Sequence, residues 1–180
     1  MGKLLVVNGS PHTNGNTAKA LTAVAEALAV NYDYTRLPLQ QLPQDFRGCR
    51  DCGPGNCVPH CRFFDDVSLQ ALLGYLEDAD AMLLGSPVYL DMPTPQVVAF
   101  LTRLNCMAEP TGRTFFPGKS AYLLATGYCS GTKAVIRTMM GACEMLGFDI
   151  PGRSTYEYIV KWNDRKIRGG QPGPGIWMPE

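Results

Sequence analysis

Gly9-Ser10-Pro11-His12-Thr13-Asn14-Gly15-Asn16-Thr17 is the stretch of sequence that decides the fold. It follows a short apolar run at residues 3–7, which predicts a fully buried parallel strand. Apolar residues then recur at steps of three and four as far as Leu28, which predicts a helix with Asn16 as its N-cap. Free backbone N–H groups and the positive end of that helix dipole would face the loop. The stretch therefore predicts an anion site suited to phosphate.

The rest of the chain alternates strand-like and helix-like segments. Strands are expected at 3–7, 32–37, 81–84, 120–125 and 155–160, and helices are expected to begin near residues 16, 66, 95 and 132. This alternation predicts right-handed βαβ units. We expect an α/β fold with a doubly wound, five-stranded parallel sheet in the flavodoxin-like order 2-1-3-4-5 and helices on both faces.

In such a sheet, ligands bind beyond the carboxyl ends of the strands, where the strand order reverses. Three loops are expected to meet there, at residues 9–17, 85–91 and 126–131. The long segment between the second strand and second helix has no periodicity, and its length suggests a function of its own.

A single domain is expected at residues 1–160, with a cysteine-rich insertion at about 43–64. Residues 161–180 are polar and then rich in glycine and proline, which predicts an extended or disordered C-terminal arm. Sixteen basic residues balance sixteen acidic ones, which argues against nucleic acid and membrane partners. The first apolar run is too short for a secretion signal or a membrane span, so a cytoplasmic location is expected.

The kind of phosphate ligand follows from motifs that the loop lacks. A P-loop would need a lysine near its end, and a dinucleotide site would show Gly-x-Gly-x-x-Gly with a later acidic residue. Neither pattern is present in residues 9–17. A lysine-free loop that holds one terminal phosphate suits FMN better than ATP or NAD.

Two motifs carry a resemblance to known proteins. Asn8-Gly9-Ser10-Pro11 followed by Asn14-Gly15-Asn16-Thr17 resembles the opening motif of the NADPH-dependent FMN reductase and iron–sulfur flavoprotein families. The stretch Asp80-Ala81-Met82-Leu83-Leu84-Gly85-Ser86-Pro87-Val88-Tyr89 resembles the third strand and flavin loop of these families. His12 stands where relatives usually carry a basic residue.

The resemblance implies an FMN phosphate on Ser10, Asn16 and Thr17, with the flavin ring along the loops that follow the third and fourth strands. The flavin-binding residues predicted from the motifs and loops are Ser10, His12, Asn14, Asn16, Thr17, Ser86, Pro87, Val88, Tyr89, Thr126, Gly127, Tyr128 and Gly131. The resemblance also implies a homodimer or homotetramer. No general acid–base pair stands out, so no catalytic side chain is predicted.

Four of the seven cysteines form a cluster, Cys49-x2-Cys52-x4-Cys57-x3-Cys61. Four thiolates can hold a [4Fe–4S] cluster, or zinc in a tetrahedral shell. This region is similar to that of iron–sulfur flavoproteins, which also hold four cysteines there but with a shorter spacing between the second and third. FMN reductases of the family carry a Gly-Cys-x-x-Cys that matches Gly48 to Cys52, and these cysteines can exist without metal. The cluster, zinc and metal-free interpretations all stay open at this point.

Three functions are compatible with these features. The first is an FMN-dependent oxidoreductase that takes a hydride from NAD(P)H and passes electrons to a small-molecule acceptor or a redox protein. The second is an iron–sulfur flavoprotein electron carrier that uses FMN and a [4Fe–4S] cluster on the four cysteines. The third is a non-catalytic flavin-binding protein.

Overall fold

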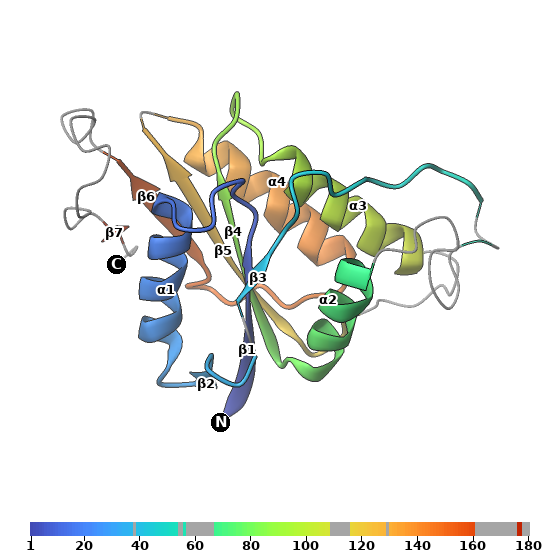
Figure 1. The fold of residues 1–180 in the computed structure, drawn as a ribbon. Coiled ribbons are helices and arrows are strands. Elements are labelled where there is room, and N and C mark those ends of the chain that lie inside the picture. Colours follow the sequence, from blue (N-terminus) through green and yellow to red (C-terminus); the bar gives the residue numbers. More distant parts are fainter. Residues whose placement is uncertain are drawn as a thin grey trace.

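The computed structural model describes residues 1–37, 39–53, 56, 67–108, 116–128, 130–160 and 176–177. Its centre is a parallel sheet flanked by helices (Figure 1). The central strands are β1 (Gly2–Asn8), β4 (Ala81–Pro87), β5 (Ser120–Gly127) and β6 (Thr155–Ile159). Strands β1, β4 and β5 are mostly apolar and buried, as parallel strands covered on both faces must be, whereas β6 alternates buried and partly exposed residues.

The edge beside β1 is formed by two short strands, β2 (Tyr32–Asp33) and β3 (Gln40–Gln41), both parallel to β1. Counting β2 as the edge strand, the order β2-β1-β4-β5-β6 is the predicted doubly wound order, which is confirmed. The expected strand at 32–37 is too long. The Asp33 carboxylate accepts hydrogen bonds from the Thr35 backbone N–H at 3.0 Å and the Thr35 hydroxyl at 2.7 Å, and this local turn ends the strand.

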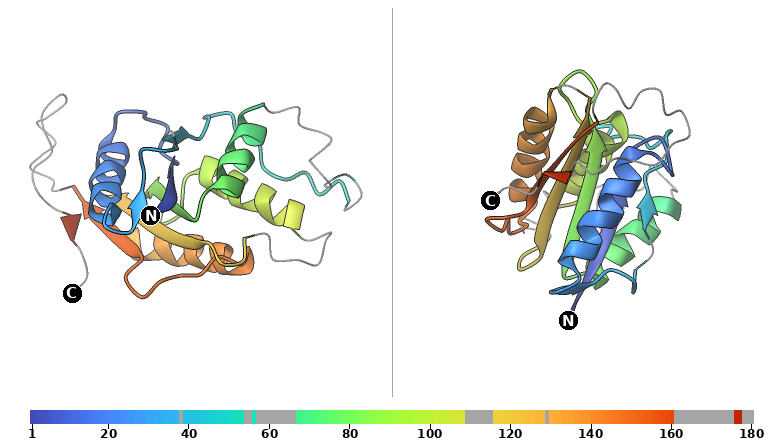
Figure 2. Two further views of the ribbon diagram at one scale, coloured as in Figure 1. Left: turned by 90° about the horizontal axis from the view of Figure 1, so that it is seen from below. Right: turned by 90° about the vertical axis from the view of Figure 1, so that its left-hand side faces the viewer.

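Alternate residues of the central strands point to opposite faces of the sheet, and each face has its own core. Helices α2 (Val67–Asp78), α3 (Pro95–Ala108) and α4 (Thr132–Met145) pack on the face that contains Leu5, Met82 and Leu123. Helix α1 (Asn16–Leu28) packs on the other face with Leu4 and Leu83. Figure 2 shows α1 and α4 on opposite sides of the sheet, so the prediction of helices on both faces is confirmed.

Two helices show local features that the sequence pattern alone does not give. The prediction of Asn16 as N-cap is wrong, because Gly15 is the N-cap of α1 and Asn16 is the first helical residue. In α4, Cys143 is fully buried in the core. Burial raises the pKa of this thiol to about 12, with a smaller contribution from the neighbouring Glu144 carboxylate.

The C-terminal part of the described chain contains β7 (Ile176–Trp177), which pairs antiparallel with β6. Residues 161–175 and 178–180 of the predicted arm lie outside the described residues, as does much of the predicted insertion at 43–64. The proposed division of the chain at residue 160 therefore stays a prediction. In the part of the chain that the structure describes, every helix is too short or too polar to cross a membrane.

Candidate functional site

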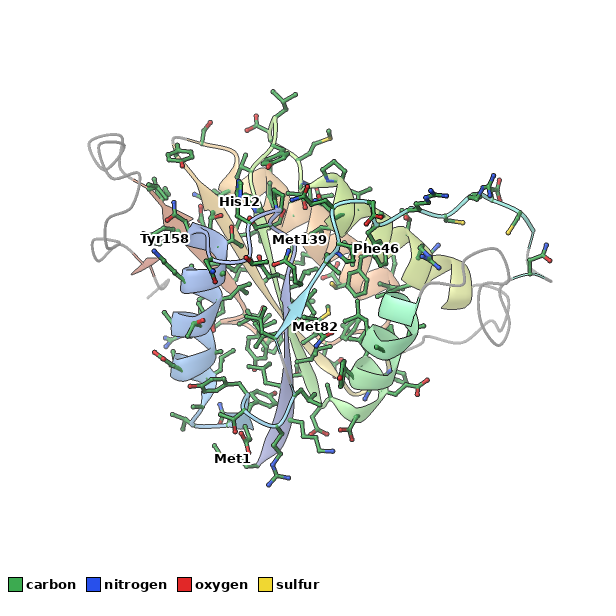
Figure 3. The ribbon with its side chains drawn as sticks, in the orientation of Figure 1. Met1, His12, Phe46, Met82, Met139 and Tyr158 are labelled. Carbon is green, nitrogen blue, oxygen red and sulfur yellow. The ribbon has the colours of Figure 1, made fainter. Side chains whose placement is uncertain are left out.

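A cleft of about 210 Å³ opens at the carboxyl ends of the central strands. The three loops expected to converge beyond β1, β4 and β5 all contribute to it, and Figure 3 places His12 at the opposite end of the sheet from Met1. The lining residues are Ser10, His12, Gly15, Asn16, Thr17, Pro87, Val88, Tyr89, Thr126, Gly127, Tyr128 and Val160.

One end of the cleft is the N-terminus of α1. The N-cap Gly15 makes no side-chain capping hydrogen bond, and the first turn of the helix carries no acidic residue. The first backbone N–H groups of a helix have no partner within the helix. This end therefore offers uncapped donors and the positive end of the helix dipole to a ligand, which is the chemistry that a phosphate needs.

Ser10 adds a hydroxyl to this end of the cleft. The side chain is buried, and its Oγ accepts a hydrogen bond from the His12 backbone N–H at 3.1 Å. A hydroxyl that accepts one hydrogen bond still has its own proton to donate. Among the described residues this proton has no protein acceptor, so it is available to a ligand oxygen.

Thr17 and Thr126 meet at the floor of the cleft. Their hydroxyl oxygens lie 2.7 Å apart, and both side chains are buried. Thr17 is in the first turn of α1 and Thr126 is near the end of β5, 109 residues later in the chain. The hydrogen bond joins the loop at residues 9–17, which we call the phosphate-type loop, to the loop at residues 126–131, which is expected along the flavin ring.

The other end of the cleft carries two aromatic side chains, Tyr89 and Tyr128. They are 44% and 51% exposed, so a planar ligand could contact them without displacing core residues. The loop after β4 makes a tight turn next to the cleft. Tyr89 and Met92 exchange two backbone hydrogen bonds of 2.9 Å around this turn.

The turn residues Leu90 and Asp91 have φ values of 51° and 60°, a left-handed conformation that costs a non-glycine residue about 1–2 kcal/mol. Strain of this kind clusters at functional sites.

Three predicted residues do not line the cleft. Asn14 is exposed at the surface, and Ser86 is fully buried, where its Oγ accepts from the Thr94 backbone N–H at 3.0 Å. Gly131 is the N-cap of α4 with a φ of 86°. Conversely, Gly15 and Val160 line the cleft without having been predicted. Gly15 stood inside the quoted loop, whereas Val160 had no signal beyond its place at the end of an expected strand.

The cysteine cluster falls only partly in the described chain. Cys49 is exposed and Cys52 is half-buried, whereas Cys57 and Cys61 lie outside the described residues. The described residues contain no group of three or more histidine, cysteine, aspartate or glutamate side chains that could hold a metal ion. The predicted four-cysteine site stays a prediction.

Comparison with known proteins identifies the family of the chain. Residues 2–156 match the sequence pattern of the NADPH-dependent FMN reductase family. An iron–sulfur flavoprotein of Methanocaldococcus jannaschii is 30% identical over 105 residues, which are 56% of this chain and 51% of that protein. The chain thus spans about half the length of this curated relative.

Solved structures show the same fold. RosB with bound 8-demethyl-8-formylriboflavin-5'-phosphate matches 97% of this chain and 68% of its own, with a TM-score of 0.65 and 20% identity. FerB, a flavoenzyme NAD(P)H:acceptor oxidoreductase from Paracoccus denitrificans, matches 84% of this chain and 76% of its own, with a TM-score of 0.60 and 19% identity.

Flavodoxins are also among the structures that share this fold, which confirms the flavodoxin-like fold class. The family match covers most of the chain. It confirms the resemblance that the motifs at residues 8–17 and 80–89 carry to this family. The chain belongs to the NADPH-dependent FMN reductase family.

Proposed function

We propose that the chain binds FMN in the cleft and works as an NAD(P)H-dependent oxidoreductase that reduces a small-molecule acceptor. The observation that carries the proposal is the composition of this one cleft. It has an uncapped helix N-terminus and a serine hydroxyl with a proton to donate at one end, and two half-exposed tyrosines at the other.

The phosphate end suits a monoester rather than a nucleoside triphosphate. Ser10 supplies a hydroxyl donor, Asn16 an amide side chain, and the first turn of α1 its backbone N–H groups. The loop contains no lysine. A single terminal phosphate can be held by such neutral donors because the helix dipole supplies the positive field.

The ring end suits a flat aromatic group. Tyr89 and Tyr128 line the cleft and are half-exposed, so an isoalloxazine can pack on them. The Val88 backbone N–H donates to the Thr126 carbonyl at 2.8 Å, and this hydrogen bond holds the two loops together. When bound, FMN supplies the chemistry by accepting a hydride from the nicotinamide and releasing electrons to an acceptor. The protein binds the phosphate and orients the ring, and it leaves the mouth of the cleft open to both substrates.

Anaerobic reduction tests this function. Apoprotein loaded with FMN is mixed with NADPH or NADH, and the oxidised flavin absorption is followed, first without and then with a small acceptor such as a quinone. The proposal expects bleaching on addition of the nucleotide and recovery on addition of the acceptor. An FMN complex that neither nucleotide bleaches would instead support the non-catalytic flavin-binding function.

A second candidate function is electron transfer by FMN and a [4Fe–4S] cluster. It is favoured by the iron–sulfur flavoprotein relative and by the Cys49-x-x-Cys52 pair. Iron and sulfide analysis of anaerobically purified protein distinguishes this function from zinc and from metal-free cysteines. About four irons per chain, lost on Cys52→Ser, would support the cluster. Flavin without iron would overturn the electron-carrier function and leave the FMN-dependent oxidoreductase as the proposed function.

We also propose that the protein assembles as a homodimer or homotetramer. Leu90 is 95% exposed and Met92 is 59% exposed, and both stand beside the mouth of the cleft. Light scattering on the wild type and on Leu90→Glu tests this assembly, since a charge in the interface should yield monomers. The cytoplasmic location stays a prediction.

A further inference from the structure

Three successive backbone carbonyls of the phosphate-type loop each accept a hydrogen bond from an amide side chain. The Ser10 carbonyl accepts from Gln41 Nε2 at 2.5 Å, and the Pro11 carbonyl accepts from Gln44 Nε2 at 3.0 Å. The His12 carbonyl accepts from Asn8 Nδ2 at 3.2 Å. Two of these three amides belong to the segment that starts at β3, about thirty residues later in the chain.

The Gln41 amide is held in one orientation. Its Oε1 accepts from Asn8 Nδ2 at 2.7 Å, while its Nε2 donates to the Ser10 and Leu42 carbonyls. Asn8 Oδ1 in turn accepts from the Ser10 backbone N–H at 3.0 Å. The two side chains therefore form a closed network around Ser10. A flipped Gln41 amide would place its oxygen against two carbonyl oxygens and its N–H groups against a donor.

The hydrogen bonds to the loop carbonyls, including the one from Gln44, determine which groups of the loop can face a ligand. A peptide unit is planar and trans, so its C=O and N–H point in opposite directions. With the Pro11 carbonyl held by Gln44, the His12 N–H points the other way, to the Ser10 Oγ that lines the cleft. Gln41 and Gln44 are not among the cleft-lining residues, so they hold the loop from behind.

We propose that Gln41 is a positioning residue for phosphate recognition. Its bond to Ser10 keeps that carbonyl oxygen away from the anion site, and its bond to Asn8 fixes the side chain that holds the His12 carbonyl oxygen. A carbonyl oxygen carries partial negative charge, and one that rotated toward a phosphate dianion would repel it. This inference rests on the proposed binding of FMN in the cleft. It assigns a role to β3, a strand that none of the predicted site residues occupies.

The test compares dissociation constants for FMN and riboflavin, which differ only by the phosphate. Gln41→Glu keeps an acceptor for Asn8 but loses the donor to Ser10, and it adds a negative charge behind the loop. FMN affinity should fall by about 10- to 100-fold and riboflavin affinity by less than about threefold. Gln41→Met, whose side chain cannot donate a hydrogen bond, should lower the ratio of FMN affinity to riboflavin affinity by about tenfold.

Two further variants complete the test. Gln40→Glu is the matched control, because it adds the same charge to the neighbouring residue of β3, whose side chain points to the other side of the strand. Its ratio should equal that of the wild type. Gln44→Ala removes the exposed amide that donates to the Pro11 carbonyl, and it should weaken FMN binding by about threefold without a matching loss of riboflavin binding. It remains informative even if the Gln41 variants do not fold.

Each outcome decides between the two proposals. A lowered FMN preference in the Gln41 and Gln44 variants supports the positioning role. A wild type that prefers FMN, with the same preference in all variants, overturns the positioning role and leaves the FMN site standing. Equal loss of both ligands would make Gln41 merely structural, and it would also overturn the inference. A wild type that binds FMN and riboflavin equally would overturn the phosphate site itself.

Discussion

Thr17 and Thr126 share a buried hydrogen bond, with their hydroxyl oxygens 2.7 Å apart. The bond ties the start of α1 to the end of β5, so the two halves of the cleft are joined at its floor. A hydroxyl in such a pair has a fixed partner and limited freedom to follow a ligand. Thr17 therefore contributes to the cleft first by joining its two sides, and only its remaining hydrogen-bonding capacity is available to a phosphate.

Thr17→Val tests this joint. Valine has the same shape but no hydroxyl, so it leaves Thr126 without this partner in a buried position. The free energy of unfolding of the apoprotein should fall by about 1–3 kcal/mol, measured by urea denaturation. Thr17→Ser keeps the hydroxyl and is the control. Valine and serine variants of equal stability would show that the hydrogen bond does not hold the sheet and helix together.

Gly131 and Gly141 offer a matched pair of substitutions around α4. A Cβ on Gly131 would lie 2.2 Å from Asp91 Oδ1, and the residue has a φ of 86°. Gly131→Ala should destabilise the protein by about 1–3 kcal/mol and disturb the loop that carries Tyr89. Gly141 lies inside the helix with nothing within 4 Å of its Cβ position, so Gly141→Ala should stabilise by about 0.5–1 kcal/mol. Thermal unfolding measures both variants, and melting temperatures that shift in the same direction from the wild type would contradict this geometry.

The two tyrosines at the mouth should recognise the ring and not the phosphate. Tyr89→Leu and Tyr128→Leu should weaken FMN and riboflavin by the same factor, about three- to tenfold each, because a stacked aromatic contact is lost. Fluorescence titration with both ligands measures this factor. Tyr34→Leu, on the edge of the molecule beside the α1 core, serves as the control. A selective loss of FMN would place the ring elsewhere.

Cys143 should make the fold sensitive to alkaline conditions. Its pKa is raised from 9.0 to about 12 by burial, so the folded state holds the thiol neutral. The stabilisation is fully present below pH 9 and is lost at up to about 1.4 kcal/mol per pH unit as the pH rises toward 12. Cys143→Ala should lose less stability than the wild type between about pH 8 and about pH 11 in urea denaturation.

Tyr122 and Tyr156 also have pKa values raised by burial, and both remain in this variant. The difference between the two proteins therefore isolates Cys143. Identical pH profiles would mean that the thiol titrates equally in the folded and unfolded states.

Local patterns were enough to predict the central fold. The apolar run before Asn8 and the three- and four-residue spacing after Asn16 identify the first strand, loop and helix, because burial imposes these periods directly. The strand expected at residues 32–37 was too long, because β2 ends at Asp33. Element ends depend on local hydrogen bonds, such as those of Asp33 with Thr35, which periodicity does not report.

The support of the site was not predictable in the same way. Ser10 and Thr17 belong to a recognisable loop, and both line the cleft. Gln41 stands in a segment without periodicity, and its bonds to Asn8 and Ser10 depend on β3 pairing with β1. A contact between residues about thirty positions apart leaves no trace in the spacing of either segment.

The central claim is that the loop before α1 recognises a phosphate monoester. Its most direct test is calorimetric titration of the apoprotein, wild type and Ser10→Ala, with FMN and with riboflavin. The wild type should bind FMN at least about tenfold more tightly, and Ser10→Ala should reduce that preference by about tenfold while riboflavin binding is unchanged. Equal affinity of the wild type for the two ligands would contradict the claim.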